Sequence, residues 1–105
     1  RDQQFGPVIM LGLGGIFVEV FRDVSFRLVP IEKVDAYEMI QELKGRRILE
    51  SFRGMLKVNT EYIVQILLAV SKLMAEHEEI SELDINPIMA YPEEAKAVDA
   101  RIILV

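Results

Sequence analysis

Residues 82–91 read ELDINPIMAY and residues 97–105 read AVDARIILV, two apolar runs with polar residues at every second position in their centres. Successive side chains of a β-strand point to opposite faces, so residues two apart share a face. Asp84 and Asn86 therefore lie on one face of the first run, while its aliphatic residues point the other way. The two runs predict the paired strands of an antiparallel hairpin.

The connection between the two runs sets the register of this hairpin. Pro92 suits the second position of a four-residue turn. With that turn, Asp84 lies opposite Arg101 and Asn86 lies opposite Asp99. Directly opposed residues of an antiparallel pair point to the same side of the sheet. The sequence thus predicts four polar groups on one face of an aliphatic hairpin.

The chemistry of these groups suits magnesium. Mg²⁺ takes oxygen ligands, commonly one or two carboxylates together with water and substrate phosphates. Asp84, Asn86 and Asp99 supply two carboxylates and an amide oxygen, and Arg101 has the charge to neutralise a carboxylate or contact a phosphate. An ordinary solvated sheet face with an Asp84–Arg101 pair has the same spacing. The spacing alone leaves both interpretations open.

The rest of the chain predicts three further strands and two helices. Apolar runs indicate strands at residues 7–11, 16–21 and 24–29. The first helix is expected to have Asp35 as its N-cap, with Glu38 as capping-box partner, and to end at Gly45. Its apolar positions are Ala36, Met39, Ile40 and Leu43.

A second helix is expected to have Asn59 or Thr60 as its N-cap. Its apolar stripe is Ile63, Ile66, Leu67, Val70, Leu73 and Met74. Strands and helices do not alternate along the chain. The predicted fold class is therefore α+β, with a mainly antiparallel sheet and two helices.

The composition of the 105 residues fits one packed domain, because 51% of them are hydrophobic. The net charge of −5 at pH 7 argues against nonspecific nucleic-acid binding, since like charges repel. Cysteine is absent, which excludes disulfides and thiolate sites and fits a cytoplasmic protein. No apolar stretch has the length of a membrane span. The sequence does not begin with methionine, and we expect it to be part of a longer chain.

Two smaller features permit more than one interpretation. The glycines at residues 12–15 lead into a predicted strand, whereas phosphate-binding glycine loops open a helix, so a hairpin connection is as good an interpretation as a phosphate contact. Glu19 shares a strand face with aromatic residues, and a carboxylate there needs a partner or a ligand. Arg27 on the next strand is a candidate partner. His77 ends an acidic helix and is interpreted as an exposed helix terminus.

Three segments together resemble the beta subunits of ADP-forming acyl-CoA synthetases, relatives of the succinyl-CoA synthetase beta subunit. They are GLGGIFVEV at residues 12–20, DVSFRL at residues 23–28, and the hairpin pair LDINP and VDAR at residues 83–87 and 98–101. The resemblance runs nearly end to end. It implies that residues 1–105 are the C-terminal lobe of an ATP-grasp fold, whose other lobe is expected before Arg1.

The resemblance also implies a reaction and partners. In the family, acyl-CoA, ADP and phosphate give a free acid, CoA and ATP, through an acyl phosphate and a phosphohistidine of the CoA-binding part. The ATP-grasp part binds Mg²⁺ with ATP or ADP. The implied partner is a CoA-binding alpha subunit or fused CoA-binding domains, so a hetero-oligomer is expected.

Site residues follow from the resemblance position by position. The metal-binding Asn and Asp of the family match Asn86 and Asp99, and Asp84 matches an acidic position beside them. The candidates for contact with nucleotide or phosphate are Glu19, Arg27, Arg53 and Arg101. The loop at residues 51–54 has Ser51 where the family usually has Gly, so its match is partial. No catalytic residue is expected within the chain, because the phosphorylated histidine has no counterpart in it.

Two other functions remain open at this point. One is another ATP-grasp ligase, or an acyltransferase with a synthetase-like region, which the presence or absence of the other lobe's phosphate-binding lysine would distinguish. The other is a noncatalytic module that mediates subunit contact. In that case, removing the charge of Asp99 would leave function unchanged.

Overall fold

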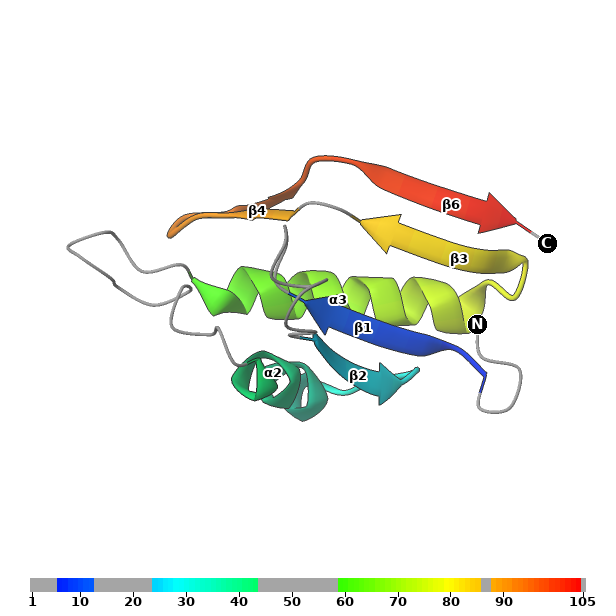
Figure 1. The fold of residues 1–105 in the computed structure, drawn as a ribbon, viewed down its shortest axis with the longest axis horizontal. Coiled ribbons are helices and arrows are strands. Elements are labelled where there is room, and N and C mark those ends of the chain that lie inside the picture. The colour runs from blue at the N-terminus through cyan, green and yellow to red at the C-terminus, as the bar shows by residue number, and fades with distance from the viewer. Residues whose placement is uncertain (1–5, 13–23, 44–58, 86–87, 105) are drawn as a thin grey trace.

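The computed structural model describes residues 6–12, 24–43, 59–85 and 88–104 (Figure 1). Their elements, in chain order, are β1 (Val8–Gly12), β2 (Val24–Leu28), α2 (Lys33–Glu42), α3 (Thr60–Glu76), β3 (Ile80–Ile85), β4 (Ile88–Ala90), β5 (Ala95–Ala97) and β6 (Ala100–Leu104). Every strand pair in these ranges is antiparallel, which confirms the predicted α+β class. No helix in the same ranges is both long and apolar enough to cross a membrane.

The strands β1 and β2 form a two-stranded ribbon with two unlike faces. Ile9 lies opposite Arg27 on the face that packs inward, where Ile9 and Ser25 are buried. These two strands confirm two of the three that the sequence predicts before the helices. The third, at residues 16–21, lies outside the described residues. The outer face of the ribbon exposes four apolar side chains, those of Val8, Met10, Phe26 and Leu28.

The start of α2 differs from the prediction. Glu32 is the N-cap, and its backbone N–H donates to Oδ2 of Asp35 at 2.7 Å. The prediction of Asp35 as the N-cap is wrong, because Asp35 is the third helical residue and its carboxylate reaches back to the cap. Glu38 is therefore not a capping partner and faces Arg27 instead. The predicted stop at Gly45 lies outside the described residues.

The apolar face of α2 is buried as predicted. Its four apolar positions, Ala36, Met39, Ile40 and Leu43, are all buried, and Ala36 and Met39 are fully inaccessible. The hydroxyl of Ser25 on β2 donates a hydrogen bond of 3.0 Å to the carbonyl oxygen of Met39. This buried polar contact fixes the ribbon on the helix, because a buried hydroxyl without a partner is costly.

The helix α3 begins where the sequence predicts. Asn59 is its N-cap, and the Asn59 side chain accepts a hydrogen bond of 3.0 Å from the N–H of Glu61. The predicted stripe is correct at Ile63, Leu67 and Met74, which are buried. Val64 and Ser71 are buried too, although the prediction omitted them.

Ser71 is buried because its hydroxyl has a structural partner. Its Oγ accepts a hydrogen bond of 2.8 Å from the backbone N–H of Ile31, in the connection between β2 and α2. This contact joins segments 40 residues apart. The main core lies between the β1–β2 ribbon, α2 and α3, and its members are Ile9, Ile31, Ala36, Met39, Ile40, Ile63, Val64 and Leu67.

The C-terminal part forms two short antiparallel pairs, β3 with β6 and β4 with β5. The sequence predicts two long strands at residues 82–91 and 97–105. The structure has β3 and β4 on either side of residues 86–87, which lie outside the described residues, and it has β5 and β6 on either side of Val98 and Asp99. A register shift lies between Ile80 and Glu82. Figure 1 shows β6 on the outer side of β3, away from α3. All five residues of β6 are accordingly exposed.

Candidate functional site

The C-terminal hairpin has the predicted turn and register. The N–H of Tyr91 donates to the carbonyl of Glu94 at 2.8 Å, which closes the turn that contains Pro92. Asp84 lies directly opposite Arg101, so the two side chains leave the ribbon on the same side. The turn predicts this opposition of Asp84 and Arg101, and the structure confirms it.

The positions of the metal-ligand candidates are known in part. Ile85 pairs with Ala100, and Ile88 pairs with Ala97. The number of intervening residues is two on both sides, so the β3–β6 pair and the β4–β5 pair have the same register. Asn86 lies outside the described residues, and its predicted position opposite Asp99 stays a prediction.

The charged side chains of the described part of this hairpin are exposed. Asp84, Asp99 and Arg101 are all exposed, although Asp84 and Arg101 are opposed. Oδ1 of Asp99 accepts a hydrogen bond of 2.9 Å from the N–H of Ala100. Within the described ranges no ion pair joins any of these three groups to another residue. Two carboxylates and a guanidinium of the hairpin are thus exposed to solvent, where a ligand can contact them.

The hairpin is also attached to the helical layer. The N–H of Asn59, the N-cap of α3, donates to the carbonyl oxygen of Tyr91 at 3.3 Å. At the same end of α3, Glu61 accepts a hydrogen bond from the hydroxyl of Tyr37 and lies 3.6 Å from Nζ of Lys33, both on α2. The hydrogen bond to Glu61 raises the pKa of Tyr37, because ionising the phenol would remove the donor. These contacts join α2, α3 and the turn.

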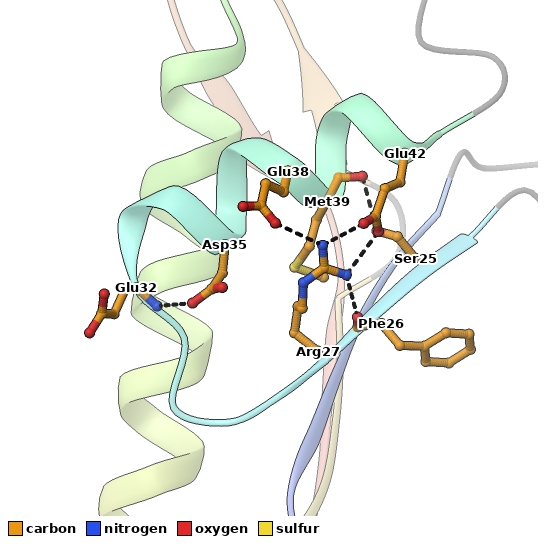
Figure 2. Close-up of polar contacts among 8 residues, drawn as sticks. All are labelled: Ser25, Phe26, Arg27, Glu32, Asp35, Glu38, Met39 and Glu42. Carbon is orange, nitrogen blue, oxygen red and sulfur yellow. Dashed lines mark hydrogen bonds and ion pairs between the residues drawn. The ribbon is translucent and has the colours of Figure 1, made fainter.

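A second charged group lies on the opposite ribbon, around Arg27 (Figure 2). Arg27 extends from β2 toward α2, and its guanidinium lies between Glu38 and Glu42. Nη1 donates to Oε1 of Glu42 at 2.8 Å and Nη2 to Oε2 of Glu42 at 2.5 Å. Nη2 also lies 3.4 Å from Oε2 of Glu38, and Nη1 donates to the carbonyl of Phe26 at 2.7 Å.

The ion pair changes the acidity of both partners. The hydrogen bond from Arg27 holds the pKa of Glu42 below its usual value, because protonating the carboxylate would break the bidentate contact. The pKa of Arg27 is raised, first by the hydrogen bond to Glu42 and further by its contacts with Glu38. Arg27 therefore stays charged. Its two carboxylate partners are exposed side chains of α2.

Comparison with known proteins identifies the family. A family model described as an ATP-grasp domain matches residues 1–104. The chain belongs to the ATP-grasp domain family. The beta subunit of acetate–CoA ligase (ADP-forming) I from Pyrococcus furiosus is 57% identical over 104 residues, covering 99% of this chain and 45% of that protein.

Solved structures match this ATP-grasp chain over its whole length. The dinucleotide-forming acetyl-coenzyme A synthetase 1 of Candidatus Korarchaeum cryptofilum, in complex with coenzyme A and acetyl-coenzyme A, gives a TM-score of 0.96 at 53% identity. The match covers 100% of this chain and 47% of that one. The same enzyme with coenzyme A and Mg-AMPPCP gives a TM-score of 0.95 at 53% identity, with 100% and 49% covered. These matches confirm the predicted resemblance and fold, and the chain spans about half the length of these proteins.

Two further candidate residues of the ATP-grasp chain, besides Asn86, have no described position. Glu19 and Arg53 lie outside the described residues, so the predicted pairing of Glu19 with Arg27 stays a prediction. His77 is the C-cap of α3, with Nδ1 3.0 Å from Oε1 of Glu79, which agrees with its interpretation as a helix terminus.

The sequence interpretation missed the partners of Arg27 on α2. Glu38 and Glu42 are four residues apart, so they lie on one face of a helix, one turn from each other. That spacing is a signal for a shared cation. The sequence pattern alone assigns Glu38 to the cap of the helix, so it gives Arg27 no partner on α2.

Proposed function

We propose that this chain is the magnesium- and nucleotide-binding part of an ADP-forming acyl-CoA synthetase. The overall reaction converts acyl-CoA, ADP and phosphate into a free acid, CoA and ATP. The match to acetate–CoA ligase (ADP-forming) over 99% of the chain supports the reaction class. The observation that carries the proposal is the hairpin, where the predicted register places the exposed Asp84 and Arg101 opposite each other.

The donor set of the hairpin fits a hard divalent cation. Asp84 on β3 and Asp99, directly before β6, offer exposed carboxylate oxygens, and the sequence adds the amide oxygen of Asn86. Mg²⁺ commonly keeps water and phosphate ligands and needs only one or two carboxylates from the protein. We propose that Asn86 and Asp99 hold Mg²⁺ with the help of Asp84. A relative with 53% identity was solved with Mg-AMPPCP, which supports the choice of ligand.

The roles of the residues follow from their charge. When bound, Mg²⁺ screens the negative charge of the phosphates. Asp99 and Asp84 would orient the nucleotide through this ion, and Arg101 would contact a phosphate oxygen from the opposing strand. Arg27, Arg53 and Glu19 are further candidates for nucleotide or phosphate contact. The chain supplies binding and orientation, and we place no nucleophile in it.

The whole enzyme requires a CoA-binding part. The similar Pyrococcus protein is named a beta subunit, which supports a partner subunit or fused CoA-binding domains. We place the enzyme in the cytoplasm, where ATP and coenzyme A are found. ATP and ADP would be its nucleotide substrates.

The experiment is an assay of the intact enzyme with its CoA-binding partner. ATP formation from acetyl-CoA, ADP and phosphate is measured for wild type, Asp99→Asn and Glu93→Gln. The last variant is the matched control, because it also removes one charge from an exposed position of the same hairpin. We expect Asp99→Asn to lower turnover by at least about tenfold, as loss of groups that support a metal does. Glu93→Gln should stay near wild type.

The outcomes separate the reaction from the site. Wild type that is inactive with several acyl-CoAs would contradict the reaction and favour another ATP-grasp ligase or an interaction module. Active wild type with an equally active Asp99→Asn would contradict the metal site alone. Thermal unfolding of each variant checks that the substitution has not unfolded the protein.

A further inference from the structure

The C-terminal hairpin is attached to α3 at both of its ends. At one end, the carbonyl of His77, the C-cap of α3, accepts a hydrogen bond of 3.1 Å from the N–H of Ile80, the first residue of β3. At the other end, the N–H of Asn59, the N-cap of α3, donates to the carbonyl of Tyr91 at 3.3 Å. The strands β3 and β4 therefore run back along α3, from its C-terminal end to its N-terminal end (Figure 1).

The metal-ligand candidates lie between these two attachments. Asp84 and Asn86 come between Ile80 and Tyr91 in the sequence, and Asp99 lies on the returning side of the hairpin. The main core includes no residue of β3, β4, β5 or β6, and every residue of β6 is exposed. The attachments to α3 therefore matter for where the ligand candidates lie.

The two attachments differ in kind. Only residues 78 and 79 separate the C-cap of α3 from β3, so the chain itself holds that end. The turn end is held by the contact of Asn59 with Tyr91. In the described part of the chain, it is the one hydrogen bond that joins residues 88–104 to α2 or to α3 and its N-cap. Loss of this bond frees the turn end while the other end stays attached.

The side chain of Asn59 fixes the backbone that makes this bond. Its Oδ1 accepts a hydrogen bond of 3.0 Å from the N–H of Glu61, which holds Asn59 in an extended conformation with φ −85° and ψ 102°. The N–H of an N-cap has no acceptor within its own helix, so it is available to Tyr91. Glu61 in turn contacts Tyr37 and Lys33 of α2. The anchor of the turn is thus supported by both helices.

We propose that Asn59 is a positioning residue for the magnesium site of the hairpin. Its side chain caps α3, and its N–H holds the turn that joins the ligand-bearing sides of the hairpin. This inference rests on the proposed function, because it takes the hairpin to bind Mg²⁺. Such a contact changes the apparent affinity for Mg²⁺ by no more than its own contribution, which for one hydrogen bond corresponds to about two- to tenfold.

The experiment separates the N–H of Asn59 from its side chain. Asn59→Ala and Asn59→Pro both remove the capping oxygen, but only proline also removes the N–H. Proline fixes φ near about −65°, close to the φ of −85° at this position. Asn59→Ser keeps both a capping oxygen and the N–H. The control is Thr60→Pro, which adds the same ring at the first helical position, where proline is common, and leaves the N–H of Asn59 in place.

The first readout is the Mg²⁺ dependence of ATP formation by the intact enzyme with its CoA-binding partner, at fixed ADP. We expect Asn59→Pro to need about two- to tenfold more Mg²⁺ for half-maximal rate than Asn59→Ala, with a similar rate at saturating Mg²⁺. Asn59→Ser and Thr60→Pro should stay near wild type. Thermal unfolding isolates the structural part, since Asn59→Ala and Asn59→Pro both lose the cap and should both unfold at a lower temperature.

A second readout needs no substitution. Coupling between two sites is reciprocal, so if the Asn59–Tyr91 bond favours Mg²⁺ binding, bound Mg²⁺ must strengthen the bond. Hydrogen exchange of the Asn59 amide in the full-length wild-type protein should therefore slow by about two- to tenfold when Mg-ADP is added. This measurement decides the question if Asn59→Pro does not fold. Unchanged exchange of this amide in the presence of bound Mg-ADP would overturn the inference.

The variants give equally clear outcomes. The same Mg²⁺ dependence in Asn59→Pro and Asn59→Ala would overturn the inference, as would an equal shift in Thr60→Pro. Asp99→Asn separates this failure from failure of the proposed function. If Asp99→Asn needs more Mg²⁺ while the two Asn59 variants agree, only the positioning role is wrong. If Asp99→Asn has the Mg²⁺ dependence of wild type, the hairpin does not bind the metal and both proposals fail.

Discussion

The two antiparallel ribbons use their charged residues in different ways. On the β1–β2 ribbon, Arg27 contacts two glutamates of α2, and the neighbouring Ser25 is buried against the same helix. On the C-terminal hairpin, Asp84 and Arg101 are directly opposed but remain exposed without an ion pair in the described part of the chain.

Among the described residues, this difference separates a ribbon whose polar side chains are already paired with α2 from a hairpin whose charged groups form no ion pair. The first ribbon lies over the main core, and its polar contacts fix it to α2. The hairpin lies outside this core, and each residue of β6 is exposed. Groups that bind a ligand must stay available to it, so they contribute little to stability before it arrives. We therefore expect substitutions in the two ribbons to affect different measurements.

The largest expected effect on stability is that of Met39→Ala. Met39 is fully buried under the β1–β2 ribbon, and truncating such a side chain typically costs about 2–5 kcal/mol. Urea unfolding of the full-length protein measures the loss. Ile102→Ala in β6 is the control, since Ile102 is 51% exposed, and should cost no more than about 1 kcal/mol. An equal loss of unfolding free energy in Met39→Ala and Ile102→Ala would contradict the view that the core under the first ribbon, and not the hairpin, carries the stability.

A smaller loss of stability is expected from Ser71→Ala. The substitution leaves the buried N–H of Ile31 without an acceptor, which costs about 1–3 kcal/mol. The same urea titration measures it. Ala69→Ser, at an exposed position of the same helix, should change the free energy of unfolding by about 0.5 kcal/mol or less. A Ser71→Ala protein as stable as wild type would show that this hydrogen bond does not anchor α3.

The sequence predicts local features of this chain better than its long-range pairs. The register of the hairpin follows from one turn, because residues 91–94 fix which positions oppose each other over the following residues. The partners of Arg27 depend on how α2 packs on β2, which no local pattern specifies. The N-cap error at Asp35 has the same origin, since acidic residues suit both the cap and the third helical position.

The candidate site is predictable to a similar degree. Spacing places Asp84 and Arg101 on one face, and the structure confirms their opposition. Spacing does not distinguish a metal site from a solvated sheet face, since both need exposed oxygens. The resemblance to a family made that distinction. The positions of Glu19, Asn86 and Arg53 lie outside the described residues.

A pH-dependent difference is expected between wild type and Glu42→Gln. The folded-state pKa of Glu42 lies below its usual value of 4.5, so its ion pair stabilises the protein above that pH. This contribution is lost as the pH falls below 4.5 and through the lowered pKa. The free energy of unfolding, measured at several pH values, should be higher for wild type than for Glu42→Gln at neutral pH. The difference should disappear in acid. A difference that grows in acid would contradict the assigned sign.

The smallest effect on stability is expected from Asp84→Asn. Asp84 is exposed and forms no ion pair within the described ranges, so the substitution should leave the free energy of unfolding unchanged or slightly higher at neutral pH. Thermal unfolding of the full-length protein provides the measurement. A clear destabilisation would show that the hairpin needs this charge for folding.

The most direct test of the central claim is the Mg²⁺ dependence of ATP formation by the intact enzyme. Mg²⁺ is titrated at fixed ADP for wild type, Asp99→Asn and the control Glu93→Gln. The account predicts that Asp99→Asn needs at least about tenfold more Mg²⁺ for half-maximal rate, with its thermal unfolding unchanged. If Asp99→Asn and Glu93→Gln show the Mg²⁺ dependence of wild type, the C-terminal hairpin does not bind the metal.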